Sequence, residues 1–231
     1  MKIAEIYASL QGEGLLAGTP SGFVRTSGCN LRCRWCDTPF TSWEPTGTDQ
    51  TTGDVYTEVV SLGLRHVVVT GGEPLLFPDV ADLCVALRRD GFHVTIETAG
   101  TVLPAVPAAT LADLMSISPK LGSSAPDDAA PGGWRQRHDA SRRRDDVLRE
   151  LCRGPHQLKF VVTSPADIDE LSRWLDDLGI QDRRQVFLMP QGCEPDDLAA
   201  VGGWLEQECR RQGYRFATRH HIAWFGHTRG T

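Results

Sequence analysis

The sequence has no long apolar run and no excess of basic residues. No segment approaches the roughly 18 consecutive apolar residues of a membrane-spanning helix, and the opening MKIAEIYASLQGEG soon turns polar, unlike a secretory signal. A formal net charge of -6 gives no electrostatic reason to bind RNA or DNA. We therefore expect a cytoplasmic protein with no membrane and no nucleic-acid partner.

The chain also lacks a change in composition that would divide it into two domains. Its 231 residues, 40% hydrophobic and 23% charged, suit one well-packed α/β domain spanning 1–231. The exception is a loop-rich insertion at about 122–146, where Pro, Gly and charged residues replace the regular pattern. We expect a solvated loop leading into a helix there, with a lid or a partner-binding patch as the alternative, because arginines cluster in it.

Strand-like and helix-like runs alternate along the rest of the chain. Strands are expected near 2–7, 22–26, 65–71, 92–98, 113–118, 157–164, 183–189 and 214–218, and helices near 78–91, 164–179 and 195–212. About six βα units in sequence predict parallel strands with right-handed crossovers. The fold class is thus α/β, either an open doubly wound sheet or an incomplete TIM-like barrel, and both bind ligands at the carboxyl ends of the strands.

The cysteines are odd in number, and three of them are grouped. Cys29, Cys33 and Cys36 lie in SGCNLRCRWCDT with the spacing C-x3-C-x2-C and no fourth cysteine or histidine close behind. A closed zinc site takes four ligands. A [4Fe-4S] cluster held by three thiolates instead leaves one iron open to another ligand. A non-catalytic zinc or iron–sulfur binding module remains the alternative.

Four of the expected strands end in polar or glycine-containing motifs: TGGEP (70–74), ETAG (97–100), SPK (118–120) and MPQG (189–192). These ends should meet at one edge of a parallel sheet. Glycine permits close approach of the backbone, and the Glu73 carboxylate can accept hydrogen bonds from an ammonium group. Four such endings are more than turns alone would explain, and they predict a ligand site at this edge of the sheet.

The cysteine spacing, with Trp35 directly before Cys36, and the GGEP motif resemble the radical S-adenosylmethionine (radical SAM) superfamily. The resemblance implies an incomplete (β/α)6 barrel in which the three cysteines hold a [4Fe-4S] cluster. S-adenosylmethionine then binds the open iron and, on reduction, yields a 5′-deoxyadenosyl radical. A glycyl-radical-enzyme activase, which also has this spacing and a compact size, is the alternative within the superfamily.

Further motifs resemble the 7-carboxy-7-deazaguanine synthase family: LQGEG (10–14), FVRTSGCNL (23–31), CDT (36–38), ETAG, SPK and the ending HTRGT. The likeness is weakest at 40–60 and 122–150. It implies a Mg²⁺-dependent ring contraction of 6-carboxy-5,6,7,8-tetrahydropterin to 7-carboxy-7-deazaguanine, with release of ammonia, on the route to queuosine and other 7-deazapurines. It also implies a homodimer and an electron donor such as flavodoxin or ferredoxin.

This resemblance implies roles for individual residues. Arg25 and Glu97 are expected to be catalytic and, with Leu10, Gln11, Gly12, Thr70 and Thr231, to bind the pterin. Residues expected at the cluster and S-adenosylmethionine are Trp35, Cys36, Asp37, Gly71, Gly72, Glu73, Ser118, Pro119, Lys120, Met189, Pro190, Gln191, Gly192 and His220. Thr38 is the expected Mg²⁺ ligand, an oxygen ligand for a hard cation. The tail also carries His221 and His227, and the sequence leaves open whether His220 or His221 faces the site.

Overall fold

The computed structural model describes residues 1–226 and 228–231, so His227 lies outside the described residues. The strands are β1 (Lys2–Leu10), β2 (Pro20–Thr26), β3 (Thr48–Asp49), β4 (His66–Gly71), β5 (His93–Thr98), β6 (Leu114–Ile117), β7 (His156–Val162), β8 (Val186–Pro190) and β9 (Arg215–Phe216). The helices are α1 (Thr52–Ser61), α2 (Asp79–Arg89), α3 (Ala108–Leu111), α4 (Trp134–Ser141), α5 (Asp145–Leu151), α6 (Pro165–Leu178), α7 (Pro195–Gln212) and α8 (His220–Phe225).

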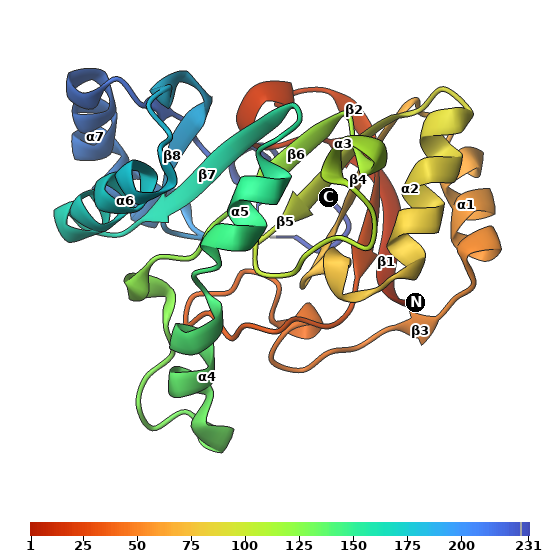
Figure 1. The fold of residues 1–231 in the computed structure, drawn as a ribbon, viewed down its shortest axis with the longest axis horizontal. Coiled ribbons are helices and arrows are strands. Elements are labelled where there is room, and N and C mark those ends of the chain that lie inside the picture. Colours follow the sequence, from red (N-terminus) through yellow and green to blue (C-terminus); the bar gives the residue numbers. More distant parts are fainter. Residues whose placement is uncertain (227) are drawn as a thin grey trace.

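All the described strands belong to one sheet in the order β3-β1-β2-β4-β5-β6-β7-β8-β9 (Figure 1). From β2 to β9 each neighbouring pair is parallel, as the alternation of strands and helices predicted. The first strand differs, because β1 pairs antiparallel with β2 and with β3. The segment 11–19 between β1 and β2 is too short for a crossover, so the chain turns back and the two strands run in opposite directions.

The helix boundaries follow local signals in the sequence. In α6, Pro165 occupies the first turn, the Asp167 carboxylate accepts a hydrogen bond from Ser164 N at 3.2 Å, and Gly179 ends the helix at a φ of 75°. Helix α1 is not among the helices that the sequence predicts. That helix begins with a capping box in which Thr51 and Asp54 bond reciprocally.

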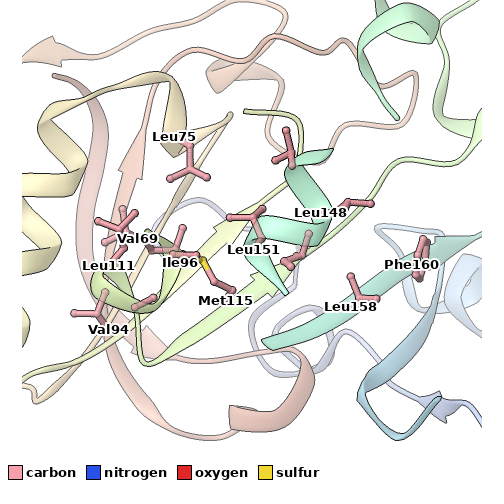
Figure 2. Packing of buried hydrophobic residues seen from close by; sticks show 14 of the residues in the cluster. Val69, Leu75, Val94, Ile96, Leu111, Met115, Leu148, Leu151, Leu158 and Phe160 are labelled. Atoms are coloured by element: carbon pink, nitrogen blue, oxygen red, sulfur yellow. The ribbon is translucent and has the colours of Figure 1, made fainter. Parts of the chain in front are cut away.

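The core lies between the sheet and the helices that cover it. Buried side chains of the parallel strands, such as Val69, Ile96 and Leu158, belong to one hydrophobic cluster with Leu148 and Leu151 of α5 (Figure 2). This burial stabilises the parallel strands and fixes the positions of their carboxyl ends. Among the described residues, no helix is long and apolar enough to cross a membrane.

The insertion at 122–146 contains α4, which projects away from the sheet (Figure 1). Its His138 is fully buried, and His138 Nε2 lies 2.8 Å from Ser124 Oγ. The insertion also contacts the cysteine loop, residues 29–36: Arg34 N donates to Ser124 O at 2.9 Å and Arg32 N donates to His138 Nδ1 at 3.3 Å. The insertion is therefore packed against the cysteine loop as well as exposed to solvent.

Candidate functional site

A cavity of about 450 Å³ lies at the carboxyl ends of the parallel strands, where the sequence places the polar motifs. The predicted residues that line it are Leu10, Gln11, Gly12, Arg25, Cys29, Cys33, Trp35, Cys36, Asp37, Thr38, Thr70, Gly71, Gly72, Glu97, Ser118, Lys120, Met189, Gln191, Gly192 and Thr231. Four others from the described chain, Glu73, Pro119, Pro190 and His220, are outside this lining. The fold thus gathers segments from almost the whole sequence around one space.

The three cysteines of the loop face this cavity as free thiols. Cys29 Sγ accepts a hydrogen bond from Leu31 N at 3.4 Å, and Cys36 Sγ lies 3.2 Å from Ser42 Oγ. Burial raises the pKa of the Cys29 thiol to about 11 and that of Cys33 to about 12, against an opposing attraction from Lys120. These thiols are protonated at neutral pH in the metal-free chain, so a bound metal must displace their protons.

The arrangement of these thiols fits a cluster. Among residues 1–226 and 228–231, no three Cys, His, Asp or Glu side chains form a group that could hold a single metal ion. A [4Fe-4S] cluster binds one thiolate at each of three irons, so its cysteines have to surround a volume. Cys29, Cys33 and Cys36 do this by lining a shared cavity.

Gly71, the last residue of β4, and Gly72 pack closely against the chain around the cysteine loop, which leaves no space for a side chain. A Cβ atom on Gly72 would overlap the backbone carbonyl oxygen of Gly28 and lie 2.7 Å from Thr41 O. The same strand end is tied to the loop by a hydrogen bond from Glu73 N to Gly28 O at 2.9 Å. Gly71 and Gly72 thus present bare backbone to the cavity beside the cysteines.

Glu73 is fully buried, and its carboxylate joins the ends of β4 and β5. It accepts hydrogen bonds from Thr98 Oγ1 at 2.8 and 2.9 Å, from Ala99 N at 2.8 Å and from Leu75 N at 3.1 Å. Burial raises the pKa of Glu73, which these donors partly offset. The carboxylate therefore binds donors at the ends of β4 and β5 and is outside the cavity lining.

A cluster of ion pairs between Lys159, Glu13 and Glu97 also lines the cavity, and of these three residues the sequence predicted only Glu97. Lys159 Nζ donates to Glu13 Oε2 at 2.9 Å and to Glu97 Oε1 at 3.1 Å. Glu97 also accepts from Gln11 Nε2 at 3.3 Å and from Thr70 Oγ1 at 3.1 Å. Burial opposes ionisation, yet Lys159 holds the pKa of Glu13 well below its usual range. A lysine within the apolar strand QLKFVV was the available sequence signal.

The tail of the chain reaches the cavity through Arg219, which the sequence does not predict as a site residue. Its guanidinium donates to Gly192 O at 2.7 Å and to Glu13 at 3.2 Å, and it pairs with Asp37. His221 lines the cavity, and the missing Cβ of Gly12 leaves space for its imidazole ring. His220 instead stacks on Trp224, with ring centroids 5.2 Å apart. The structure therefore places His221, and not the predicted His220, at the site.

Arg25, on β2, also lines the cavity. Arg25 Nε donates to Glu5 Oε1 at 2.7 Å and Arg25 Nη2 donates to Tyr7 OH at 2.6 Å. Glu5 also accepts from Arg229 Nε at 2.8 Å, which brings the last residues of the chain, including Thr231, to the cavity. Hydrogen bonds from Nε and Nη2 therefore hold in place a guanidinium that lines the cavity.

Thr38 follows the cysteine loop in the sequence and lines the cavity beside it. Thr41 Oγ1 donates to Thr38 O at 2.9 Å, and the Thr38 hydroxyl is 3.4 Å from Asp37 Oδ1. Hydroxyl and carboxylate oxygens are ligands that Mg²⁺ accepts together with water. The residues here thus fit a partly hydrated Mg²⁺ that borrows its remaining ligands from a bound molecule.

Comparisons with known proteins agree with this site. A family model described as "Radical SAM superfamily" matches residues 23–151. The "7-carboxy-7-deazaguanine synthase" of Rhodopirellula baltica is 44% identical, over 99% of this chain and 88% of the relative. That of Halobacterium salinarum is 45% identical, over 96% and 90%. The crystal structure of QueE from Escherichia coli superposes with a TM-score of 0.69 at 25% identity, covering 95% and 94% of the two chains. This likeness confirms the expected partial barrel.

Proposed function

The chain belongs to the 7-carboxy-7-deazaguanine synthase family of the radical SAM superfamily, and on this premise we propose that its cavity binds 6-carboxy-5,6,7,8-tetrahydropterin beside the [4Fe-4S] cluster and S-adenosylmethionine. The observation that carries the proposal is that the three cysteines, the Gly71–Gly72 backbone and the Arg25 and Glu97 side chains line the same space. The reaction is the ring contraction to 7-carboxy-7-deazaguanine in the biosynthesis of queuosine and other 7-deazapurines.

We assign one side of the cavity to the cluster and S-adenosylmethionine. When bound there, they supply a 5′-deoxyadenosyl radical for hydrogen abstraction. The chain contributes thiolates from Cys29, Cys33 and Cys36 and bare backbone at the glycines. Lys120, whose ammonium donates to Ser118 Oγ at 2.8 Å, also faces this space, so both side chains can hydrogen-bond the cofactor.

We assign the other side to the pterin. Glu97 keeps a fixed position because Lys159, Thr70 and Gln11 all donate to it, which orients its carboxylate toward N–H donors of a heterocycle. Arg25 can pair with the substrate carboxylate, since a guanidinium offers donors in two directions. Fixed donors and acceptors of this kind place the reacting carbon without reorganisation during the reaction.

We place Mg²⁺ at Thr38, where the hydroxyl and the substrate oxygens would share the ion. Mg²⁺ held there would help to orient the substrate carboxylate and would stabilise negative charge on its oxygens. Arg219 helps to position this segment because it pairs with Asp37, the neighbour of Thr38. We further propose a single domain over 1–231, a cytoplasmic homodimer and a flavodoxin or ferredoxin as electron donor.

The test begins with anaerobic reconstitution with iron and sulfide, followed by metal analysis. We expect brown absorbance and an iron–sulfur cluster, which Cys33→Ala abolishes; one zinc per chain without that absorbance would contradict the proposal. Thr38→Ala should keep the cluster and raise the Mg²⁺ concentration needed for turnover. Thr38→Ser, which retains the hydroxyl, is its control. Normal turnover by Thr38→Ala at limiting Mg²⁺ would remove this residue from the metal site.

A further inference from the structure

Glu5 on β1 shares its carboxylate between two arginines that are far apart in the sequence. Glu5 Oε1 accepts a hydrogen bond from Arg25 Nε at 2.7 Å, and Glu5 Oε2 accepts one from Arg229 Nε at 2.8 Å. The Glu5 and Arg25 side chains are 13% and 16% exposed, whereas that of Arg229 is 52% exposed. All three residues line the cavity. Two cations and one anion thus meet at this part of the cavity wall.

Further contacts hold Arg229 in this position. Arg229 Nη2 donates to Ala4 O at 3.0 Å, and the guanidinium carbon lies 4.2 Å from the ring centroid of Phe40, which also lines the cavity. A partly exposed ion pair is weak by itself. Because the backbone of β1 and an aromatic ring also bind this guanidinium, its positive charge keeps a fixed place beside Glu5.

The side-chain charges at this place do not cancel. Among the described residues, Glu5 is the one carboxylate that forms an ion pair with Arg25 or Arg229, so one positive charge remains. Asp37, which also lines the cavity, pairs instead with Arg219. Without Arg229, the negative charge of Glu5 would offset that of Arg25, and Arg25 would attract an anion less strongly.

Arg25 keeps a donor group available for such an anion. Its Nε and Nη2 bind Glu5 and Tyr7, whereas Nη1 has no hydrogen-bond partner within residues 1–226 and 228–231. A guanidinium binds a carboxylate through these N–H groups. A carboxylate that binds Arg25 also lies near Glu5, whose charge repels it unless Arg229 neutralises that charge.

We propose that Arg229 is a positioning residue that makes the site selective for a carboxylated pterin, and that it acts by neutralising Glu5. This inference rests on the proposed function, in which Arg25 pairs with the carboxylate of the substrate. Glu5 holds the Arg25 guanidinium in place through Nε, and Arg229 offsets the charge that Glu5 brings. The positive charge of Arg25 is then available to the substrate.

The test measures the Kd of two stable probes by calorimetry, with reconstituted protein, S-adenosylmethionine and Mg²⁺ but no reductant. 6-Carboxypterin carries the carboxylate, and pterin is the same ring without it. In Arg229→Gln, the Kd for 6-carboxypterin should rise at least about fivefold, the contribution of one partly exposed charge, while that for pterin should stay within about twofold. The control Arg173→Gln changes an exposed arginine of α6 and should shift neither Kd by more than about twofold.

The double variant Glu5→Gln/Arg229→Gln separates charge from structure. It removes the negative charge of Glu5 together with the positive charge of Arg229, and the glutamine keeps an oxygen that can accept from Arg25 Nε. The Kd for 6-carboxypterin should therefore return to within about twofold of the wild type. An unchanged Kd for 6-carboxypterin in Arg229→Gln, an equal rise for both probes, or a double variant that binds no better than Arg229→Gln would overturn the proposal.

Turnover with dithionite separates this proposal from the function itself. Arg229→Gln should raise the KM for 6-carboxy-5,6,7,8-tetrahydropterin by more than it lowers kcat, because the carboxylate is held alike before and during the reaction. A fall in kcat at unchanged KM would contradict the proposal. Product from the wild type together with equal binding of the two probes would overturn the proposal and leave the function intact. Wild-type protein that forms no product and binds neither probe would contradict both.

Discussion

Replacing Lys159 by methionine tests how the cavity tolerates the half-buried carboxylates of Glu13 and Glu97. The lysine side chain is 3% exposed and its ammonium lies 2.9 Å from Glu13 and 3.1 Å from Glu97. Removing one partner of a buried ion pair costs about 3–5 kcal/mol because the remaining charge stays desolvated. We expect about 3 kcal/mol, the lower end of that range, because Arg219 still pairs with Glu13 and Thr70 still donates to Glu97.

The loss in the free energy of unfolding should depend on pH. In the wild type, despite its burial, Glu13 has a pKa held below 4.5 by Lys159 and Arg219, so its charged form stabilises the fold above that pH. Without Lys159 the two carboxylates repel each other, and the loss should be largest near pH 7.5 and shrink toward pH 5 as protons bind.

The assay is urea denaturation at both pH values, with Lys120→Met as the matched control. The Lys120 ammonium faces the same cavity but donates to a hydroxyl, so its removal should cost under about 1 kcal/mol. A loss below about 1 kcal/mol in K159M, or one that is the same at both pH values, would refute the reasoning.

Three further outcomes are expected. Arg219→Gln weakens the contacts of the tail with Glu13, Gly192 and Asp37. Limited proteolysis should then cleave within residues 218–231 faster than in the wild type, and an unchanged rate would contradict this. Gly72→Ala should lower the free energy of unfolding by about 1–3 kcal/mol and reduce iron content, since its Cβ meets the Gly28 carbonyl. Burial lowers the pKa of His66 from 6.5 to about 4, so the urea midpoint should fall as the pH drops between these values, and less so in His66→Gln.

The fold was largely predictable because buried parallel strands read as continuous apolar runs between helices with clear caps. The antiparallel pairing of β1 was not predicted, because it depends on the length of the connection at 11–19 and not on the pattern of residues in the strand. The helix α1 has few buried apolar positions, chiefly Val55 and Val59. Two buried valines make only a weak helical pattern, so the capping box is the one clear sign of α1 in the sequence.

The candidate site was predictable where residues follow a strand or carry a motif, because strand ends converge at one edge of the sheet. Lys159 and Arg219 escaped prediction for a different reason. They reach Glu13 across 146 and 206 positions of the chain, respectively, and only the folded structure shows those pairs. Likewise, His220 and His221 are adjacent in sequence, and their places were decided by the stacking of His220 on Trp224 and by the space beside Gly12.

The central claim is that this cavity converts 6-carboxy-5,6,7,8-tetrahydropterin to 7-carboxy-7-deazaguanine. The most direct measurement is mass spectrometry of the products after anaerobic incubation of the reconstituted protein with this substrate, S-adenosylmethionine, Mg²⁺ and dithionite. We predict 7-carboxy-7-deazaguanine that disappears when S-adenosylmethionine is omitted. Protein with an intact [4Fe-4S] cluster that forms none of this product would contradict the claim.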